Sequence, residues 1–241
     1  MYTCRRLVQV AAVCVLMLGC LFIVHDPAGA ATHPRGGTLI YVRSADSNFL
    51  DAGFTTITED LDVVVNVLDT LVTATEKGEI KPALATAWKS SDNKVWTFEL
   101  RQGVKFHDGS LFTSEDVVFS IGRHIPGSGM LSYAGRTSAL GLWMGDLIES
   151  VETQGDYRVT ITLAKPYAFF LHAMASSPAS IVSKKAAEKA GDGFALWPIG
   201  TGPFKMTEWI KGDRLVLTRN SDYWDGKAPY LDRVVFKVVP D

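Results

Sequence analysis

The chain has 241 residues, of which 47% are hydrophobic and 21% charged, a composition that indicates a globular protein and excludes a disordered one. The formal net charge of −2, without a run of basic residues, argues against nucleic-acid binding.

The N-terminal segment has the pattern of an export signal. Arg5 and Arg6 precede an apolar run over residues 7–24, and small residues follow up to Ala30. A positive start, an apolar stretch and a small-residue cleavage site are typical of a signal peptide. We predict a signal peptide over residues 1–30 with cleavage after Ala30. Because the apolar run is nearly long enough to span a bilayer, an uncleaved membrane anchor is the alternative.

The cysteines lie only in this leader, at Cys4, Cys14 and Cys20. A lipid anchor on Cys20 is a further alternative, although the residues before it fit a lipoprotein signal poorly. The remaining domain, residues 31–241, would have no disulfide and no cysteine nucleophile or metal ligand. Export without disulfides is compatible with a bacterial periplasm.

The first elements after the leader are a strand and a helix. Residues 38–43 are predicted as a short strand and residues 44–57 as a polar loop. Thr58 is predicted to cap a helix, with Glu59 and Asp60 in its first turn, where the helix dipole favours acidic residues. The apolar residues that follow have helical spacing. Further along, residues 82–88 are predicted to form a short helix with proline near its start.

The segment Leu100–Ile121 carries the most local information. A strand is predicted over residues 96–100, where large and polar residues alternate. After a turn at Asp108-Gly109, Thr113 is a good helix N-cap, and Asp116 has the spacing to bond back to it. The sequence therefore predicts a strand, a turn and a capped helix in succession.

His107 beside Asp108 raises the question of a metal or acid–base site. One histidine next to one aspartate in a turn is weak support, since no His, Cys or Glu cluster accompanies the pair. An exported hydrolase that uses these two residues is the enzymatic alternative, but no nucleophile or metal-binding motif supports it. We predict a structural role, no catalytic residue, no metal site and no cofactor.

The C-terminal half mixes hairpins with short helices. We predict hairpins over 147–163 and 204–219, helices over 166–174 and from Ser183 to about Ala190, and a last strand over 231–239. Residues 126–143 follow no clear pattern. The whole predicts a mixed α/β (α+β) fold.

Several segments, taken in order, resemble one family. These are Ile80–Trp88, Trp96–Arg101, Leu100–Ile121, Gly200–Phe204 and Asn220–Trp224. Together they resemble the family 5 extracellular solute-binding proteins of ABC importers, which include dipeptide-, oligopeptide- and nickel-binding members. Each segment is weak alone, but the ordered set is specific.

The resemblance implies a periplasmic receptor that closes two lobes around a ligand. This chain would supply lobe I of a type II (cluster C) receptor, with the second lobe absent. The implied partners are a peptide or similar small solute and the permease and ATPase subunits in the inner membrane. The implied ligand-binding residues are Phe54, Thr55 and Thr56, on the loop after the first strand, and Trp143. An ordinary surface loop is the alternative for the first three, and a core position is favoured for Trp143.

A single lobe encloses less of a ligand than two lobes do. Ligand sites normally bury about 70–90% of a ligand, so one lobe alone would lose much of its contact. A loss of about 4 kcal/mol turns a micromolar site into a millimolar one. We expect negligible binding by this chain alone. The alternative is a non-binding remnant or interaction domain of a truncated gene.

Overall fold

The computed structural model describes residues 35–144, 146–226 and 229–240. The predicted signal peptide, Cys20 and the cleavage point after Ala30 lie outside these residues. Within the described ranges, no helix combines the length and the apolar character needed to cross a membrane.

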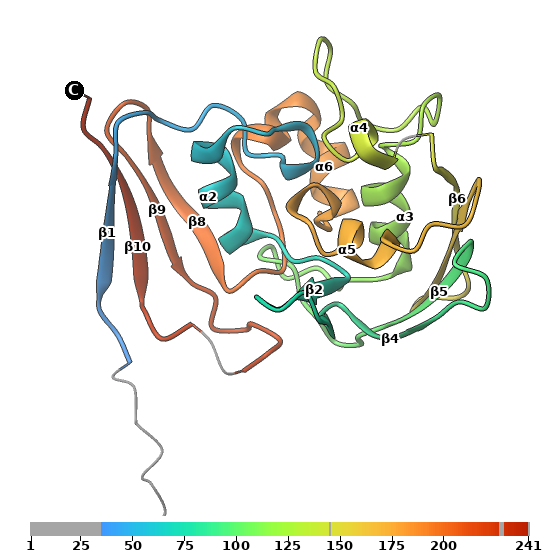
Figure 1. The fold of residues 1–241 in the computed structure, drawn as a ribbon. Coiled ribbons are helices and arrows are strands. Elements are labelled where there is room, and N and C mark those ends of the chain that lie inside the picture. The colour runs from blue at the N-terminus through green and yellow to red at the C-terminus, as the bar shows by residue number, and fades with distance from the viewer. Residues whose placement is uncertain (1–34, 145, 227–228, 241) are drawn as a thin grey trace, which may run out of the picture. The chain divides into compact units, whose positions relative to one another are not determined.

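The strands form two larger sheets and one hairpin (Figure 1). The first sheet has the order β1-β10-β9-β8, with β1 (Thr38–Arg43), β8 (Phe204–Ile210), β9 (Arg214–Arg219) and β10 (Arg233–Val238). The second has the order β4-β5-β7-β6, with β4 (Ala85–Lys89), β5 (Val95–Leu100), β6 (Ile148–Thr153) and β7 (Arg158–Leu163). The hairpin joins β2 (Val72–Ala74) to β3 (Ile80–Pro82). Only the β1–β10 pairing is parallel among these described strands.

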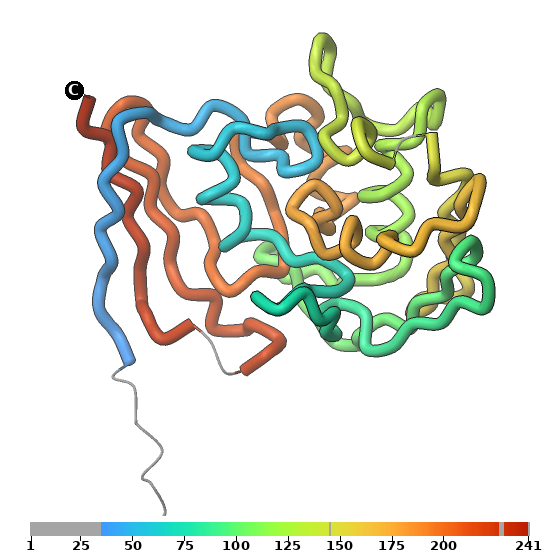
Figure 2. Tube along the Cα trace, viewed as in Figure 1, coloured from blue at the N-terminus to red at the C-terminus, as the bar shows by residue number. Residues whose placement is uncertain are grey.

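Short helices fill the space beside the sheets (Figures 1 and 2). The α-helices are α2 (Thr58–Val67), α3 (Ser114–Gly122), α4 (Gly141–Met144), α5 (Phe170–Met174) and α6 (Lys184–Ala190). The 3₁₀ helices are η1 (Ala52–Phe54), η2 (Ser177–Ala179) and η3 (Gly191–Leu196).

Each larger sheet has its own apolar core. Val63, Val64 and Val67 of α2 belong to the core that includes the buried face of the first sheet. The second sheet curves around α3 and α5, and its core contains Phe98 and Phe170. Burial of apolar surface therefore holds each sheet to the helices that cover it.

Several local predictions are confirmed. The Thr113 backbone N–H donates to the Asp116 carboxylate over 2.9 Å, which completes the predicted capping box. Ser183 caps α6 by accepting from the Ala186 N–H over 3.2 Å. Both hairpins and the first and last strands also form where they are predicted, within a few residues.

Three local predictions are wrong. Residues 82–88 are not helical, because Ala85–Lys89 pairs with β5 and sheet pairing overrides the helix propensity of alanine. Thr58 is the first helical residue rather than the cap; Ile57 holds the cap position without a side-chain bond. The helix predicted over 166–174 contains only Phe170–Met174, since the Tyr167 N–H is held by the Asn93 carbonyl over 3.0 Å.

Candidate functional site

The loop after β1 meets a segment far along the chain. The Ala139 N–H donates to the Gly53 carbonyl over 2.8 Å, which ties η1 to the residues before α4. The Phe54 ring contacts the edge of Tyr133, with ring centroids 5.1 Å apart. The structure thus brings the predicted ligand loop together with the segment that the sequence left unassigned.

Two adjoining hollows lie at this junction. Their volumes are about 280 and 480 Å³. Both are lined by Phe54, Arg136, Thr137 and Leu142, and the smaller one also by Thr55 and Thr56. We call this surface the η1 face. It is open and mixes apolar groups and hydroxyls with the charged side chains of Arg123, Arg136 and Asp146.

The predicted residues of the loop differ in what they offer a ligand. Phe54 and Thr55 are each only 4% exposed, whereas the Thr56 side chain is exposed. The Thr55 hydroxyl donates to Asp60 over 2.8 Å and accepts from the Ile57 N–H over 3.2 Å. Thr55 therefore shapes the loop, and Thr56 presents the free hydroxyl. Phe54 and Thr55 are buried and Thr56 is exposed, so a ligand-binding role for the loop stays a prediction beside its alternative, an ordinary surface loop.

Trp143 is not a core residue, contrary to the favoured expectation. It is 66% exposed on the short helix α4, next to Leu142, which is 63% exposed. Leu142 lines both hollows, and Trp143 lies beside them rather than in their walls. Four helical residues are too few to bury both faces of α4.

A buried ion pair holds the residues that underlie the η1 face. The Arg123 guanidinium donates to both carboxylate oxygens of Asp51, over 2.6 and 2.8 Å, and the two side chains are 1% and 0% exposed. The Tyr133 hydroxyl donates to the same carboxylate over 2.9 Å. Burial, together with the Asp51 charge, raises the pKa of Tyr133 far above its ordinary value. The three side chains fix the positions of η1, α3 and residue 133.

A second buried carboxylate holds the loop to α2. Asp60 accepts from the backbone N–H groups of Asn48 and Phe49, over 2.7 and 3.1 Å, and from the Thr55 hydroxyl. It lies in the first turn of α2, where the helix dipole favours a negative charge. The loop over residues 48–55 is therefore preorganised on the start of α2.

The His124 side chain packs against the backbone of η1, behind the η1 face. Its Nδ1 lies 2.7 Å from the Ser138 hydroxyl oxygen, and that oxygen accepts a hydrogen bond from the Gly141 N–H over 2.6 Å. Burial, followed by the Arg123 charge, lowers the pKa of His124 well below its ordinary value. A Cβ added to Gly53 would lie 2.8 Å from His124 Nε2, so the ring packs directly on the backbone of η1.

Arg136 also lines both hollows, and the sequence analysis did not predict it. Its guanidinium carbon lies 3.6 Å from the centre of the Phe49 ring, and the side chain is exposed where the two hollows meet. It forms no ion pair with any of the described residues, so it is free for an anionic group. The stretch around it lacks periodicity, and a lone arginine in such a stretch carries no local signal.

His107 and Asp108 each serve the local structure. His107 Nε2 lies 3.0 Å from the Gly202 carbonyl, and burial lowers its pKa. Asp108 accepts from the backbone and hydroxyl of Ser110, over 3.0 and 2.6 Å, and so closes its own turn. In the described part of the chain, no group of three or more His, Cys, Asp or Glu side chains is arranged to hold a metal ion.

The chain is similar to several peptide-binding proteins. It is 37% identical over 183 residues to the dipeptide-binding protein of Escherichia coli K12, covering 68% of this chain and 33% of that protein. It is 34% identical over 215 residues to the oligopeptide-binding protein AppA of Bacillus subtilis 168, covering 86% and 38% respectively. Among solved structures, the periplasmic binding protein DppA of Helicobacter pylori, in complex with the peptide STSA, superposes with a TM-score of 0.80 at 36% identity. That superposition covers 86% of this chain and 44% of the other.

The chain also matches a protein family. Residues 79–241 match the family described as bacterial extracellular solute-binding proteins, family 5 Middle. The chain spans about two fifths of the length of these relatives, and its fold corresponds to one lobe of theirs. With the ordered sequence segments and the fold in agreement, the chain belongs to the family 5 extracellular solute-binding proteins.

Proposed function

We propose that the protein captures peptides, or a closely related small solute, in the periplasm and presents them to the permease and ATPase subunits of an ABC importer. The peptide cargo is supported by the relatives named as dipeptide- and oligopeptide-binding proteins and by the peptide bound in the similar structure. The proposed route to the periplasm is a signal peptide over residues 1–30. The mass of the exported protein separates cleavage after Ala30 from the lipid anchor on Cys20.

The η1 face is the proposed ligand wall of this lobe. The carrying observation is that Thr56, Arg136 and Thr137, from segments 80 residues apart, together line the smaller hollow, and that Arg136 and Thr137 also line the larger one. Thr56 and Thr137 offer hydroxyls to peptide backbone groups, and Arg136 offers a cation to a carboxylate. Leu142 and Trp143 supply exposed apolar surface for side chains of the ligand.

The loop that carries the proposed ligand wall is held rigidly by hydrogen bonds. Asp51 and Asp60 hold the loop by buried hydrogen bonds, while the ligand-facing groups stay at the surface. A preorganised wall reduces the free energy lost in ordering side chains on binding. This arrangement suits a binding protein.

The test is a titration of the ¹⁵N-labelled full chain with a dipeptide and a tetrapeptide, followed by NMR. We expect millimolar affinity, with the amide signals of Thr56, Arg136 and Thr137 shifting in a saturable way. Arg136→Gln should weaken binding by about tenfold, as expected for one charge-assisted hydrogen bond. Arg233→Gln, which removes an exposed arginine on β10 away from the hollows, is the matched control.

Two results would refute the proposal. One is an absence of shifts at the η1 face while peptides bind elsewhere on the chain. The other is an equal loss of affinity in the Arg136 and Arg233 variants, because the effect would then be one of net charge only.

A further inference from the structure

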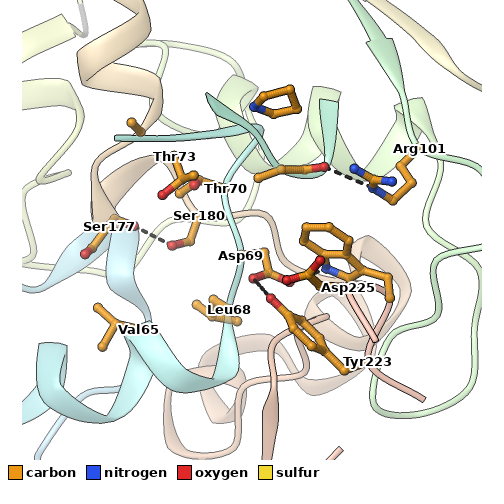
Figure 3. Close-up of a pocket in the computed structure, with 14 residues that line it drawn as sticks. Val65, Leu68, Asp69, Thr70, Thr73, Arg101, Ser177, Ser180, Tyr223 and Asp225 are labelled. Carbon is orange, nitrogen blue, oxygen red and sulfur yellow. Dashed lines mark hydrogen bonds between the residues drawn. The ribbon is translucent and has the colours of Figure 1, made fainter. Parts of the chain in front are cut away.

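A third hollow lies at the other end of α2 and has no part in the proposed peptide site. Its volume is about 410 Å³ (Figure 3). Its walls come from the end of α2, the β2–β3 hairpin, the residue after β5, the region of η2 and the segment after β9. The ten residues of α2 span about 15 Å, which separates this hollow from the η1 face. We call it the Asp69 pocket.

The Asp69 carboxylate is fixed by three donors. The Thr201 hydroxyl and the Trp224 indole N–H each donate to Oδ2 over 2.8 Å, and the Tyr223 hydroxyl reaches Oδ1 over 3.3 Å. A carboxylate offers about four lone-pair positions, so Oδ1 retains one for a ligand. Burial raises the pKa of Asp69, and no cation forms an ion pair with it among the residues that the structure describes. The carboxylate is therefore oriented but lacks a counter-charge.

Arg101 places a positive charge on another wall of the same pocket. The Arg101 guanidinium carbon lies 4.5 Å from the centre of the Trp224 ring, and Arg101 Nε donates to the Ala83 carbonyl over 3.1 Å. These two contacts hold the guanidinium plane and leave its terminal N–H groups without a bonded partner in the described ranges. Such a fork matches the two oxygens of a carboxylate.

Asp225 adds a second negative group at the rim. Its side chain is exposed, lines the pocket and acts on Asp69 through its charge. Figure 3 shows Asp225 beside Asp69, with Arg101 apart from both. The pocket thus carries negative charge in one part and positive charge in another.

The aromatic residues do not offer a free stacking surface. One face of Trp224 carries the Arg101 guanidinium, and the Tyr223 ring lies 5.3 Å away at an interplanar angle of 53°. A flat platform of the kind that stacks sugars or bases is therefore absent from the described walls. Recognition in this pocket depends on its charges and hydroxyls.

We propose that the Asp69 pocket binds a small zwitterion, an amino carboxylate, with its ammonium between Asp69 and Asp225 and its carboxylate on the fork of Arg101. An ammonium group supplies the counter-charge that Asp69 lacks and uses the free position on Oδ1. The volume suits a molecule of amino-acid size rather than a long peptide. The site is separate from the η1 face and does not depend on the function proposed for that face.

The test uses zwitterions of increasing charge separation. The full chain, ¹⁵N-labelled, is titrated with glycine, β-alanine and 4-aminobutyrate, and separately with methylamine and acetate. The readout is the Trp224 indole N–H signal, assigned with Trp224→Phe, because this group donates directly to Asp69. We expect at least one zwitterion to shift it in a saturable way, with methylamine and acetate each weaker by about tenfold.

Variants connect the binding to the named groups. Asp225→Asn and Arg101→Lys should each weaken the zwitterion by about tenfold, the latter because lysine keeps the charge but lacks the fork. Asp222→Asn is the matched control, since Asp222 is an exposed neighbour outside the pocket wall. The Thr56 amide, recorded in the same spectra, reports the η1 face independently.

Three results would overturn the proposal. The first is no response of Trp224 to any of the three zwitterions. The second is methylamine binding as tightly as the best zwitterion, which would make this a plain amine site. The third is equal effects of Asp225→Asn and Asp222→Asn, which would assign the binding to overall charge.

Discussion

Asp51→Ala removes one half of the buried ion pair below the η1 face and leaves Arg123 without its partner. Both side chains are essentially inaccessible to water, and the two hydrogen bonds between them are 2.6 and 2.8 Å long. Removing one partner of a buried pair costs about 3–5 kcal/mol, because the remaining charge stays buried and unpaired. The Tyr133 hydroxyl loses its acceptor in the same variant. We expect a loss of about 4 kcal/mol, a large part of the 5–15 kcal/mol typical of folded proteins.

The surface pair Arg158–Glu99 is a natural control for this reasoning. Its N···O distance of 2.7 Å is almost the same, but its side chains are 50% and 42% exposed. Exposed pairs contribute about 0–1 kcal/mol, since water and salt screen them. Glu99→Ala should therefore change stability by less than about 1 kcal/mol. The two pairs match in distance but differ in burial and in the number of hydrogen bonds, since among the described residues the Asp51 carboxylate accepts four and the Glu99 carboxylate accepts one.

The assay is urea unfolding followed by circular dichroism, with linear extrapolation of the unfolding free energy to water. A triple variant, Asp51→Leu with Arg123→Met and Tyr133→Phe, removes every polar member of the group. It should be more stable than Asp51→Ala, because no unpaired charge remains. A loss below about 1 kcal/mol in Asp51→Ala, equal to that of Glu99→Ala, would refute the burial argument.

Three further predictions follow from the fold. Gly202→Ala places a Cβ 2.6 Å from the backbone carbonyl carbon of Val67 at the end of α2, and it should destabilise the fold by about 1–3 kcal/mol. Gly193→Ala is the control, because a Cβ at that position has no neighbouring atom within 4 Å. Thermal unfolding compares the two variants. Asp116→Ala breaks the capping box of α3 and should cost about 1 kcal/mol in urea unfolding. The lowered pKa of His124 means that, below the ordinary histidine pKa of about 6.5, the unfolded chain binds a proton that the folded state does not. The free energy of unfolding should therefore fall with falling pH, by up to about 1.4 kcal/mol per pH unit, and His124→Gln should flatten that slope in urea titrations at pH values from 7 to 5.

Local patterns predicted the elements that have a local signal in the sequence. The strand β5 alternates buried and more exposed residues along its length, and that period of two is visible in the sequence. The capping box at Thr113 and Asp116 is likewise a short-range signal. Residues 82–88 failed because alanine favours a helix in isolation, while pairing with β5 is a long-range contact that no local pattern encodes.

The candidate sites were harder to predict for the same reason. The family resemblance implied Thr56 as a ligand residue, whereas Arg136, which lines the same smaller hollow, was not predicted because its segment has no periodicity. The Asp69 pocket joins residues far apart in the chain, such as Trp224 and Asp69, which are 155 positions apart and hydrogen-bonded. Only the folded chain places these groups together, so the sequence could not predict the pocket.

As the proposed ligand wall, the η1 face would supply one side of a binding site. Asp51 and Asp60 fix the wall with buried bonds, so little ordering is left to be done when a ligand arrives. The groups that would contact a peptide, Thr56 and Arg136, remain exposed, and an open wall cannot bury the roughly 70–90% of a ligand that is usual for tight sites. A preorganised wall favours some ligands over others. High affinity also needs a second surface that excludes water from the side of the ligand facing away from the wall. We therefore expect this face to determine which group of a peptide is held, and a covering surface to determine how tightly.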